Sequence, residues 1–437
     1  MQTNNSTSTN DFYQELKIRG IIETSSLQDE ERLKKMLNEE SIRFYIGYDP
    51  TAKSLQLGNL FCVLTMKRFQ QQGHKPFILV GGATGMIGDP SGKSQERQLL
   101  DGETLQSNVE AIKKQLSQLL NMNDGENKAV LVNNHDWIGK FSFIEFLRDV
   151  GKRFRLSEML AKDSVKSRLH SEVGISFTEF TYQMIQAYDF RYLNRHHQVT
   201  FQLGGADQWG NITAGIDLTR KMNSTEVFGL VIPLVTDAQG NKFGKSVGGT
   251  AIYLDPEMTS PYQMYQYLLN VDDETVIKLL NFYSFKSLEE INFLKEKMQT
   301  EAHLRLAQKA LAEELVTVVH GAHELEKAKK ATSIFFGEKI QGLSDLELAQ
   351  IFYDVPSITL QKSTLDEGLS ILDLLSATPL FESKGDARRA ITQKGAYLNN
   401  DLQLVDPNLM ITTLHLASES YLVIRKGKKN YCAVKFI

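Results

Sequence analysis

Three polar residues near the middle of the chain are spaced so that they share one face of a helix. Tyr182, Gln186 and Asp189 stand at i, i+4 and i+7, and a turn of 100° per residue puts their side chains on the same side. These groups suit recognition of an amino acid, because a carboxylate accepts from an ammonium or a phenol and an amide supplies either partner. On spacing alone, a helix with a polar solvent face is favoured over a binding face.

A glycine-rich segment at 81–93 suits close approach of the backbone to a ligand. Its sequence is GGATGMIGDPSGK, and Lys93 at its end suits a phosphate. The segment is not a Walker A loop, because Ile87 stands five positions before Gly92, where that loop requires a glycine. This argues against a kinase-like site, and a turn-rich connection without a function stays open.

Two further lysines flank a glycine in the segment 242–246, whose sequence is KFGKS. Such a pair can stabilise the charge that develops on departing pyrophosphate, which is electrostatic stabilisation of a transition state. An ordinary exposed basic loop is the alternative interpretation.

The elements that must position these groups follow from the apolar pattern. Short apolar runs alternate with helical patterns from about residue 11 to 235, which predicts a parallel sheet of βα units. Strands are expected at 42–47, 76–81 and 199–203, each running into a glycine-rich turn. Because open α/β sheets bind ligands at the carboxyl ends of their strands, the site is expected there.

Beyond the sheet, the sequence predicts a helical domain at 250–350, with one helix over 307–319. Pro356 and several Ser and Thr residues predict a linker over 351–368, before a small domain at 369–437. Residues 1–10 are Asn, Ser and Thr in the main, which predicts a disordered tail.

Charge is distributed unevenly along the chain. From Lys384 to Ile437, nine Lys or Arg residues face four Asp or Glu, a balance of +5, which leaves −9 elsewhere for a formal total of −4. The densest patch in this region suits a polyanion, and it consists of Arg425, Lys426, Lys428 and Lys429. By charge alone, a solvated surface explains the patch equally well.

The overall composition, with 41% hydrophobic and 23% charged residues, is that of a soluble globular protein. No run approaches the roughly 18 consecutive apolar residues of a membrane-spanning helix, so no membrane partner is expected. The only cysteines, Cys62 and Cys432, are far apart and form no metal-ligand spacing. A reducing, cytoplasmic location and no protein-bound metal are therefore expected.

Taken in order, these segments resemble the motifs of class I aminoacyl-tRNA synthetases, and of the bacterial tyrosyl-tRNA synthetase family in particular. The segment 45–59, YIGYDPTAKSLQLGN, is similar to the HIGH signature, and 242–246 is similar to the KMSKS signature. Segments 80–93, 177–189 and 202–211 resemble the tyrosine-specific motifs. The resemblance runs through nearly the whole chain.

The C-terminal segments 373–379 and 384–399 resemble the alpha-L RNA-binding module. The resemblance therefore implies an α/β fold with three parts: a Rossmann-like parallel-sheet catalytic domain, a helical anticodon-binding domain and a small α+β alpha-L-type domain. It also implies that L-tyrosine and ATP form tyrosyl-adenylate and pyrophosphate, after which tyrosine is transferred to the 3′ end of tRNA(Tyr). ATP is then a substrate with Mg²⁺, without a tightly bound metal or organic cofactor.

The resemblance assigns site residues position by position. Those implied to bind tyrosine are Tyr45, Asp89, Tyr182, Gln186, Asp189, Gln202 and Gln208. Those implied to bind ATP are Asp49, Gly58, Gly205, Asp207 and Lys245. Those implied to act in catalysis are Thr51, Gln56, Asn59, Lys93, Arg97, Lys242, Lys245 and Ser246. Those implied to bind tRNA are Arg388, Arg389, Lys394, Arg425, Lys426 and Lys428.

Three positions depart from the family pattern. Gln56 stands where the first signature usually begins with histidine, and Asn59 stands at its last position; an amide cannot become cationic. Ile46 stands where many relatives have a cysteine near the ribose. A noncatalytic RNA-binding paralogue is therefore the alternative from another class, and a tryptophan enzyme is the nearer rival, although Tyr45 with Asp189 suits a phenol better than an indole.

The resemblance also implies a homodimer. The segment 143–154 is apolar at helical spacing and is the candidate interface. A helix buried within the domain would have the same pattern.

Overall fold

The computed structural model describes residues 11–91, 100–169, 174–245, 249–335, 337–340, 342–353, 355–427 and 430–437. The tail expected at 1–10 lies outside them. The chain divides into two units, the first formed by Met1–Ser260 with Tyr267–Val319 and the second by Pro261–Gln266 with His320–Ile437.

The first unit is built on a six-stranded sheet with the order β1-β6-β5-β2-β3-β4. Its strands are β1 (Thr24–Ser25), β2 (Arg43–Tyr48), β3 (Lys75–Val80), β4 (Val130–Asn133), β5 (Phe201–Gly205) and β6 (Phe228–Ile232). All the neighbouring pairs are parallel except β1 with β6. The α/β fold and the three predicted strands are therefore confirmed.

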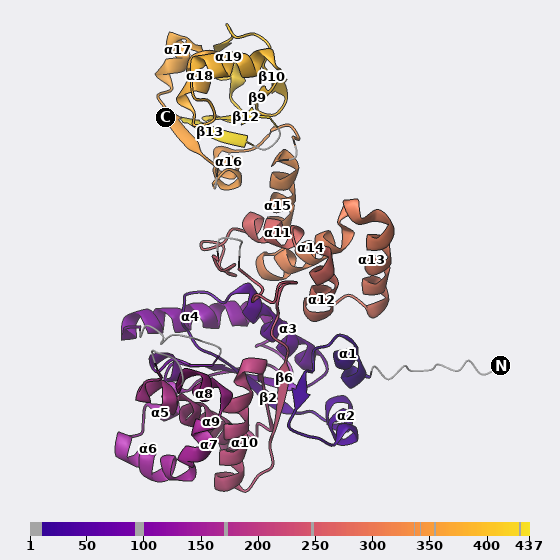
Figure 1. Ribbon diagram of the computed structural model, residues 1–437, viewed down its shortest axis with the longest axis vertical. Coiled ribbons are helices and arrows are strands. Elements are labelled where there is room, and N and C mark those ends of the chain that lie inside the picture. The colour runs from indigo at the N-terminus through magenta and orange to yellow at the C-terminus, as the bar shows by residue number, and fades with distance from the viewer. Residues whose placement is uncertain are drawn as a thin grey trace, which may run out of the picture. The chain divides into compact units, whose positions relative to one another are not determined.

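Helices surround this sheet (Figure 1). They are α1 (Phe12–Ile18), α2 (Glu30–Glu39), α3 (Leu57–Gln71), α4 (Gly102–Leu119), α5 (His135–Ile138), α6 (Phe143–Asp149), α7 (Leu156–Leu160), α8 (Asp163–Leu169), α9 (Phe177–His197) and α10 (Trp209–Asn223). The strands between them are nearly continuous apolar runs, as expected for a parallel sheet that is covered on both faces.

The helix α9 carries the polar triplet found in the sequence. It begins after Ser176, whose hydroxyl accepts from the Glu179 N–H group, and it ends before Gln198, which adopts a left-handed conformation. Tyr182 and Asp189 are buried at 5% and 1% exposure, so a solvent-facing triplet is excluded.

The first unit also contains a helical part formed by α12 (Asp273–Tyr283), α13 (Leu288–Glu301) and α14 (Leu306–His320). The helix expected at 307–319 is α14. The helix α11 (Pro261–Leu269) contributes its last residues to this unit.

The second unit contains a five-stranded sheet with the order β10-β9-β12-β13-β7. Its elements are α15 (Ala322–Phe335), α16 (Asp345–Ile351), β7 (Ser357–Leu360), α17 (Ser363–Glu367), β8 (Leu369–Ser370), α18 (Ile371–Ala377), α19 (Lys384–Thr392), β9 (Ala396–Leu398), β10 (Leu402–Gln403), β11 (Met410–Ile411), β12 (Tyr421–Lys426) and β13 (Asn430–Phe436).

The alternation along β12 explains why this sheet is covered on both faces. Leu422 and Ile424 belong to the core that contains α18 and α19, whereas Tyr421 and Val423 belong to the core that contains α15 and α16. Successive residues of a strand point to opposite faces, so one short strand serves both cores.

Two expected boundaries differ from the structure. The segment expected as a linker, 351–368, contains β7, which pairs in parallel with β13, and α17. The end of the helical domain expected at 350 also differs, because α15 and α16 pack on the C-terminal sheet. Pro356 directly precedes β7, and Ser357 and Thr359 lie within it. Because β7 is an edge strand, a proline beside it is tolerated, since its missing N–H group needs no partner.

A buried ion pair joins α8 to α9. The Arg168 guanidinium lies 2.8 Å from the Glu179 carboxylate, and the two side chains are exposed to only 2% and 1%. Arg168 Nε also donates to the carbonyl of Gly174 at 3.0 Å. The pair therefore ties the start of the polar helix to the segment before it.

We expect the Arg168→Met variant to lose about 3–5 kcal/mol of unfolding free energy, because Glu179 would stay buried without its cation. Urea unfolding followed by tryptophan fluorescence measures the loss, since both tryptophans lie in the first unit. The control is Arg220→Met, whose pair with Asp217 is solvent-exposed and should cost under about 1 kcal/mol. Equal losses in the two variants would contradict a special role for the buried pair.

Candidate active site

A cavity of about 390 Å³ opens at the carboxyl ends of the parallel strands of the first unit. Every proposed tyrosine- or ATP-binding residue lines it. So do five of the proposed catalytic residues, namely Thr51, Gln56, Asn59, Lys242 and Lys245. Lys93, Arg97 and Ser246 lie outside the described residues.

The sheet register explains how two of these side chains meet. Tyr45 on β2 pairs with Gln202 on the neighbouring parallel strand β5. Partners in a parallel ladder point to the same face, and both residues line the cavity. Asp49 and Asp207 follow the ends of the same two strands, and Gly205 is the last residue of β5.

The Asp189 carboxylate is the most deeply buried charge of the site. It accepts from Trp137 Nε1 at 2.8 Å and from Asn134 Nδ2 at 3.0 Å. Burial raises the pKa of Asp189 to about 7, although these two hydrogen bonds lower it in part. The two donors therefore hold a costly buried carboxylate in place while one of its faces meets the cavity.

Three polar atoms around the cavity are buried and have no hydrogen-bond partner within the described part of the chain. They are Tyr45 Oη, Gln186 Oε1 and Gln202 Oε1. A buried polar atom without a partner costs roughly 1–3 kcal/mol, so such atoms are rare in a finished core. Their grouping around one cavity indicates that a polar ligand completes them.

A second carboxylate, Asp89, lies in the glycine-rich segment. It accepts from the Ser91 N–H group at 2.9 Å and from Gln208 Nε2 at 2.7 Å. The Gln208 amide is in turn held by Asn211, whose Nδ2 donates to Gln208 Oε1 at 3.1 Å. These bonds fix the orientation of the Asp89 carboxylate, which lines the same cavity as the polar residues of α9.

Asp49 is held at the start of the loop that follows β2. Thr84 Oγ1 donates to Asp49 Oδ1 at 2.7 Å, and Tyr182 Oη donates to Asp49 Oδ2 at 3.0 Å. A Cβ atom at Gly81 would clash with both the Asp49 carboxylate and the Thr84 hydroxyl, so a side chain there would displace this hydrogen-bonded pair. The glycine-rich segment therefore makes space for the Asp49 carboxylate and supplies a hydrogen-bond donor to it.

Positive groups gather at the other end of the cavity. Lys242 Nζ lies 3.6 Å from Asp207 Oδ2, and burial raises the pKa of Asp207 while Lys242 lowers it in part. The helix α3 begins at the cavity, and the N–H group of Gln56 donates to Asn59 Oδ1 at 3.0 Å. The amide pair therefore closes the first turn of α3.

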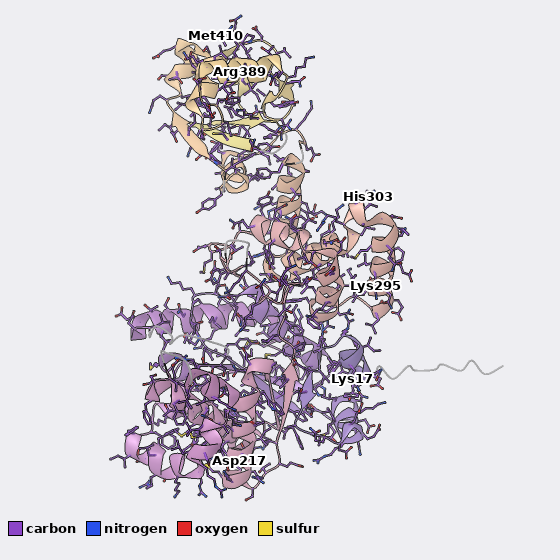
Figure 2. All side chains as sticks on the ribbon, viewed as in Figure 1. Lys17, Asp217, Lys295, His303, Arg389 and Met410 are labelled. Carbon is purple, nitrogen blue, oxygen red and sulfur yellow. The ribbon has the colours of Figure 1, made fainter. Side chains whose placement is uncertain are left out.

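The proposed tRNA-binding residues lie in the second unit. Arg388, Arg389 and Lys394 are exposed on or just after α19, and Figure 2 shows Arg389. Lys426 is bound internally, because its amino group donates to Asp386 and to the carbonyl of Leu380, both at 2.9 Å. The guanidinium of Arg425 stacks on the ring of Tyr397 at 4.0 Å. Lys428 lies outside the described residues.

Asn134 and Trp137 were not identified from the sequence. Both follow β4, whose end meets the ends of β2 and β3 at the same edge of the sheet. The signal that was available is the short apolar run 129–132 followed by four polar residues. That run is too short to be distinguished from a turn by periodicity.

Comparisons with known proteins agree with this geometry. A family model described as tRNA synthetases class I (W and Y) matches residues 37–337, and a model of the tyrosine–tRNA ligase SYY-like C-terminal domain matches residues 347–434. The first unit has a parallel sheet with a polar cavity and two lysines at its strand ends. Together with the family match, this geometry identifies the unit as the catalytic unit of a class I aminoacyl-tRNA synthetase.

The relatives narrow this class. The chain is 47% identical to a tyrosine–tRNA ligase of Roseiflexus castenholzii, over 97% of this chain and 99% of the relative. It is 48% identical to that of Bacillus velezensis, over 97% and 99%. It also resembles the structure of a truncated mitochondrial tyrosyl-tRNA synthetase of Aspergillus nidulans, with 28% identity, a TM-score of 0.67 and coverage of 75% and 94%. The chain belongs to the tyrosine–tRNA ligase family.

The raised pKa of Asp189 predicts a pH dependence of tyrosine binding. As the pH falls through about 7, the carboxylate takes up a proton and loses its strength as an acceptor, so the dissociation constant should rise, approaching about tenfold per pH unit. The Trp137→Phe variant removes a donor that lowers this pKa, so the inflection should move to higher pH.

Equilibrium dialysis of labelled tyrosine between pH 5.5 and 9 measures both curves. The matched control is Trp209→Phe, because Trp209 lies on α10 and does not line the cavity. Superimposable curves for wild type and Trp137→Phe would contradict the assignment of the inflection to Asp189.

Proposed function

We propose that this cavity activates L-tyrosine with ATP and then transfers the tyrosyl group to the 3′ end of tRNA(Tyr). The observation that carries the proposal is the group of unpartnered polar atoms, Tyr45 Oη, Gln186 Oε1 and Gln202 Oε1, around the same cavity as the Asp189 carboxylate. A free amino acid with a phenolic side chain supplies a donor or acceptor for each of them.

At the inner end of the cavity, the substrate phenol donates to Asp189 and accepts from Tyr45. Burial keeps the pKa of Tyr45 well above its usual value, so its hydroxyl remains a donor at neutral pH. Phenylalanine would leave both groups without a partner in a buried place. The α-ammonium group lies among Asp89, Tyr182 and Gln186, while Gln202 and Gln208 lie on the carboxylate side.

At the outer end, ATP lies with its ribose at Gly205 and Asp207 and its phosphates near Lys242 and Lys245. A carboxylate oxygen of tyrosine bonds to the α-phosphorus, the bond from that phosphorus to the bridging oxygen breaks, and pyrophosphate leaves. No general base is needed, because the carboxylate is already ionised. Catalysis is then positioning together with stabilisation of charge on the leaving group by the two ammonium groups.

The nucleotide side also involves Asp49 and Thr51 in the loop after β2, and Gln56, Gly58 and Asn59 at the start of α3. The N–H group of Leu57 donates to the Ile252 carbonyl, and those of Asn59 and Leu60 donate to the Gln56 carbonyl. The helix therefore favours the phosphates mainly through the positive end of its dipole. Mg²⁺ enters with the nucleotide as part of the substrate. Lys93, Arg97 and Ser246 are assigned to the phosphates by the family resemblance alone.

In the second step, a ribose hydroxyl at the 3′ end of the tRNA attacks the tyrosyl carbonyl, and AMP leaves. For contact with the tRNA, we propose the exposed residues Arg388 and Arg389 on α19 and Lys394 just after it, together with Arg425 and Lys428. Lys426 serves mainly to hold Asp386 and the carbonyl of Leu380.

The first measurement is exchange of labelled pyrophosphate into ATP with tyrosine, phenylalanine or tryptophan as the amino acid. Exchange is expected with tyrosine alone. In the Tyr45→Phe variant, kcat/KM for tyrosine should fall about tenfold and the preference over phenylalanine should narrow, because one hydrogen bond to the phenol is lost.

The control for this experiment is Tyr13→Phe, whose hydroxyl donates to Glu30 at 2.8 Å outside the cavity. It should behave like wild type. If the folded wild-type protein shows no exchange with any of the three amino acids, the catalytic proposal fails and an RNA-binding paralogue is supported.

We also propose that the enzyme is a cytoplasmic homodimer. Both thiols, Cys62 and Cys432, are free, as in a reducing compartment. No helix in the described residues is long and apolar enough to cross a membrane. The proposed interface is a row of exposed apolar side chains on α6 and α7, consisting of Phe143, Ile144, Leu147, Leu156 and Leu160, which are 37–74% exposed. A second copy of the same row would cover them.

Ile144→Lys places a charge in this row and should convert the dimer to a monomer without unfolding it. Sedimentation velocity over a range of protein concentrations measures the change. Phe293→Lys on α13 is the matched control, because Phe293 is 54% exposed outside the row. A monomeric wild type, or equal dissociation of both variants, would contradict the proposed interface.

A further inference from the structure

Two tyrosines from the helical part of the first unit contact the segment that carries the cavity lysines. Tyr267 Oη accepts from the N–H group of Gly244 at 2.9 Å. Tyr283 Oη, at the end of α12, donates to the carbonyl of Leu57, the first residue of α3, at 3.1 Å. The ring of Phe243 contacts both tyrosines, with centroid distances of 5.4 and 6.1 Å.

The segment 242–245 lies directly on the first turn of α3. Gly244 has a φ of +94°, and a Cβ atom there would lie 3.2 Å from the backbone nitrogen of Gly58 and 3.3 Å from Leu57 Cβ. The Gly244 carbonyl accepts from Ile252 N at 2.8 Å. With its N–H group bonded to Tyr267, both polar groups of this residue are fixed, between Lys242 and Lys245.

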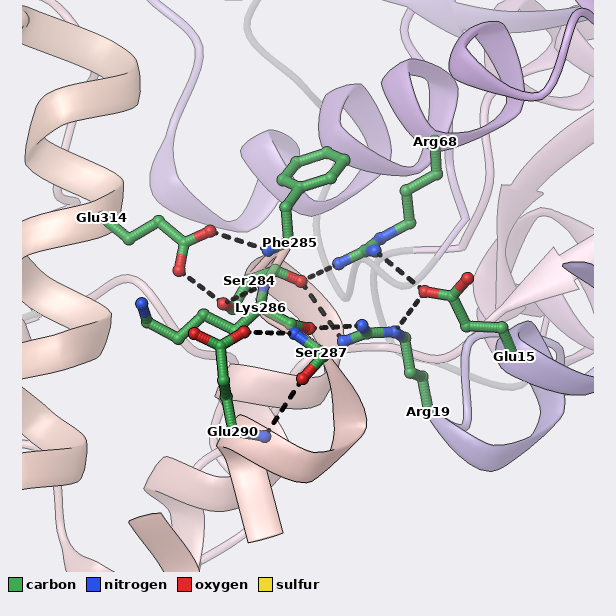
Figure 3. Close-up of polar contacts among 9 residues, drawn as sticks. All are labelled: Glu15, Arg19, Arg68, Ser284, Phe285, Lys286, Ser287, Glu290 and Glu314. Atoms are coloured by element: carbon green, nitrogen blue, oxygen red, sulfur yellow. Dashed lines mark hydrogen bonds and ion pairs between the residues drawn. The ribbon is translucent and has the colours of Figure 1, made fainter. Parts of the chain in front are cut away.

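The residues that follow Tyr283 are held by charged groups (Figure 3). Arg68, on α3, and Arg19 both donate to the carbonyl of Ser284, and Arg19 donates to the carbonyl of Lys286 at 2.6 Å. Glu314 accepts from the N–H group of Phe285 at 2.7 Å. The residues after Tyr283 are therefore bound to α3 as well.

Neither tyrosine lines the cavity, so neither is placed to touch a substrate. Their hydroxyl groups nevertheless bond to the two backbone segments that carry the HIGH-like and KMSKS-like motifs. Each hydroxyl can be removed without loss of the ring, which separates positioning from packing.

We propose that Tyr267 and Tyr283 are positioning residues for the ATP step. Through their hydroxyl groups and the ring of Phe243, they fix the backbone of residues 242–245 on the start of α3, and so set where the amino groups of Lys242 and Lys245 enter the cavity. The inference rests on the proposed function, in which these lysines bind the phosphates of ATP.

The test compares full-length wild type with Tyr267→Phe, Tyr283→Phe and the control Tyr13→Phe in tyrosine-dependent pyrophosphate exchange. In Tyr267→Phe, kcat/KM for ATP should fall about fivefold, as expected for one lost hydrogen bond, while KM for tyrosine stays unchanged. Tyr283→Phe should shift the same constant in the same direction. Tyr13→Phe should match wild type, because the hydrogen bond that it loses is made to Glu30, away from the cavity.

A double-variant cycle shows whether the tyrosine acts through a lysine. On a Lys245→Ala background, Tyr267→Phe should cause little further loss, since the group that it positions is gone. Additive losses would overturn the inference, as would unchanged ATP kinetics in Tyr267→Phe or an equal rise of the KM values for ATP and tyrosine. These outcomes test the inference only if the wild-type protein catalyses tyrosine-dependent pyrophosphate exchange. If the wild-type protein shows no exchange, the proposed function itself is overturned.

Discussion

The burial of one carboxylate, Asp189, constrains much of the catalytic unit. A carboxylate that is 1% exposed must be surrounded by donors, because the free energy of an unpaired buried charge is high. Asn134 and Trp137 supply two of them from the residues after β4, while Asp189 itself comes from α9. Two segments more than 50 residues apart in the sequence must therefore meet at one edge of the sheet.

The Asp189 carboxylate also keeps acceptor positions that a substrate can use. A carboxylate has about four acceptor positions, and the two protein donors use only some of them. Tyr45 enters from β2, and its hydroxyl has no partner among the described residues. Under the proposed function, the phenol of the substrate supplies the missing partners, so its recognition would depend on the burial of these groups.

The sequence predicted the strands β2, β3 and β5 because each is a short apolar run that leads into a glycine-rich turn, and it predicted the shared face of α9 from the helical period. Tyr182, Gln186 and Asp189 are 3.6-period partners on a helix, and the lattice of a parallel sheet then brings β2 and β5 together. Asn134 and Trp137 could not be predicted, since the four-residue strand β4 has no measurable period. The edge strand β7 was mistaken for a linker for a similar reason, because its pairing with β13 is a contact over more than 70 residues that local pattern does not encode.

The charge pattern misled at one position for a physical reason. Lys426 counts as one positive charge in the sequence, but its amino group is used by Asp386 and by the carbonyl of Leu380, and it also lies 4.6 Å from the ring of Phe381.

The first signature, at residues 45–59, shows the opposite case. Gln56 and Asn59 lack the positive charge of histidine, yet the Gln56 N–H group bonds to Asn59 Oδ1 and leaves the Asn59 NH₂ group as the end that can meet a phosphate. Because the N-terminus of α3 and two lysines already supply positive potential at this end of the cavity, an amide pair that orders the first turn is compatible with catalysis.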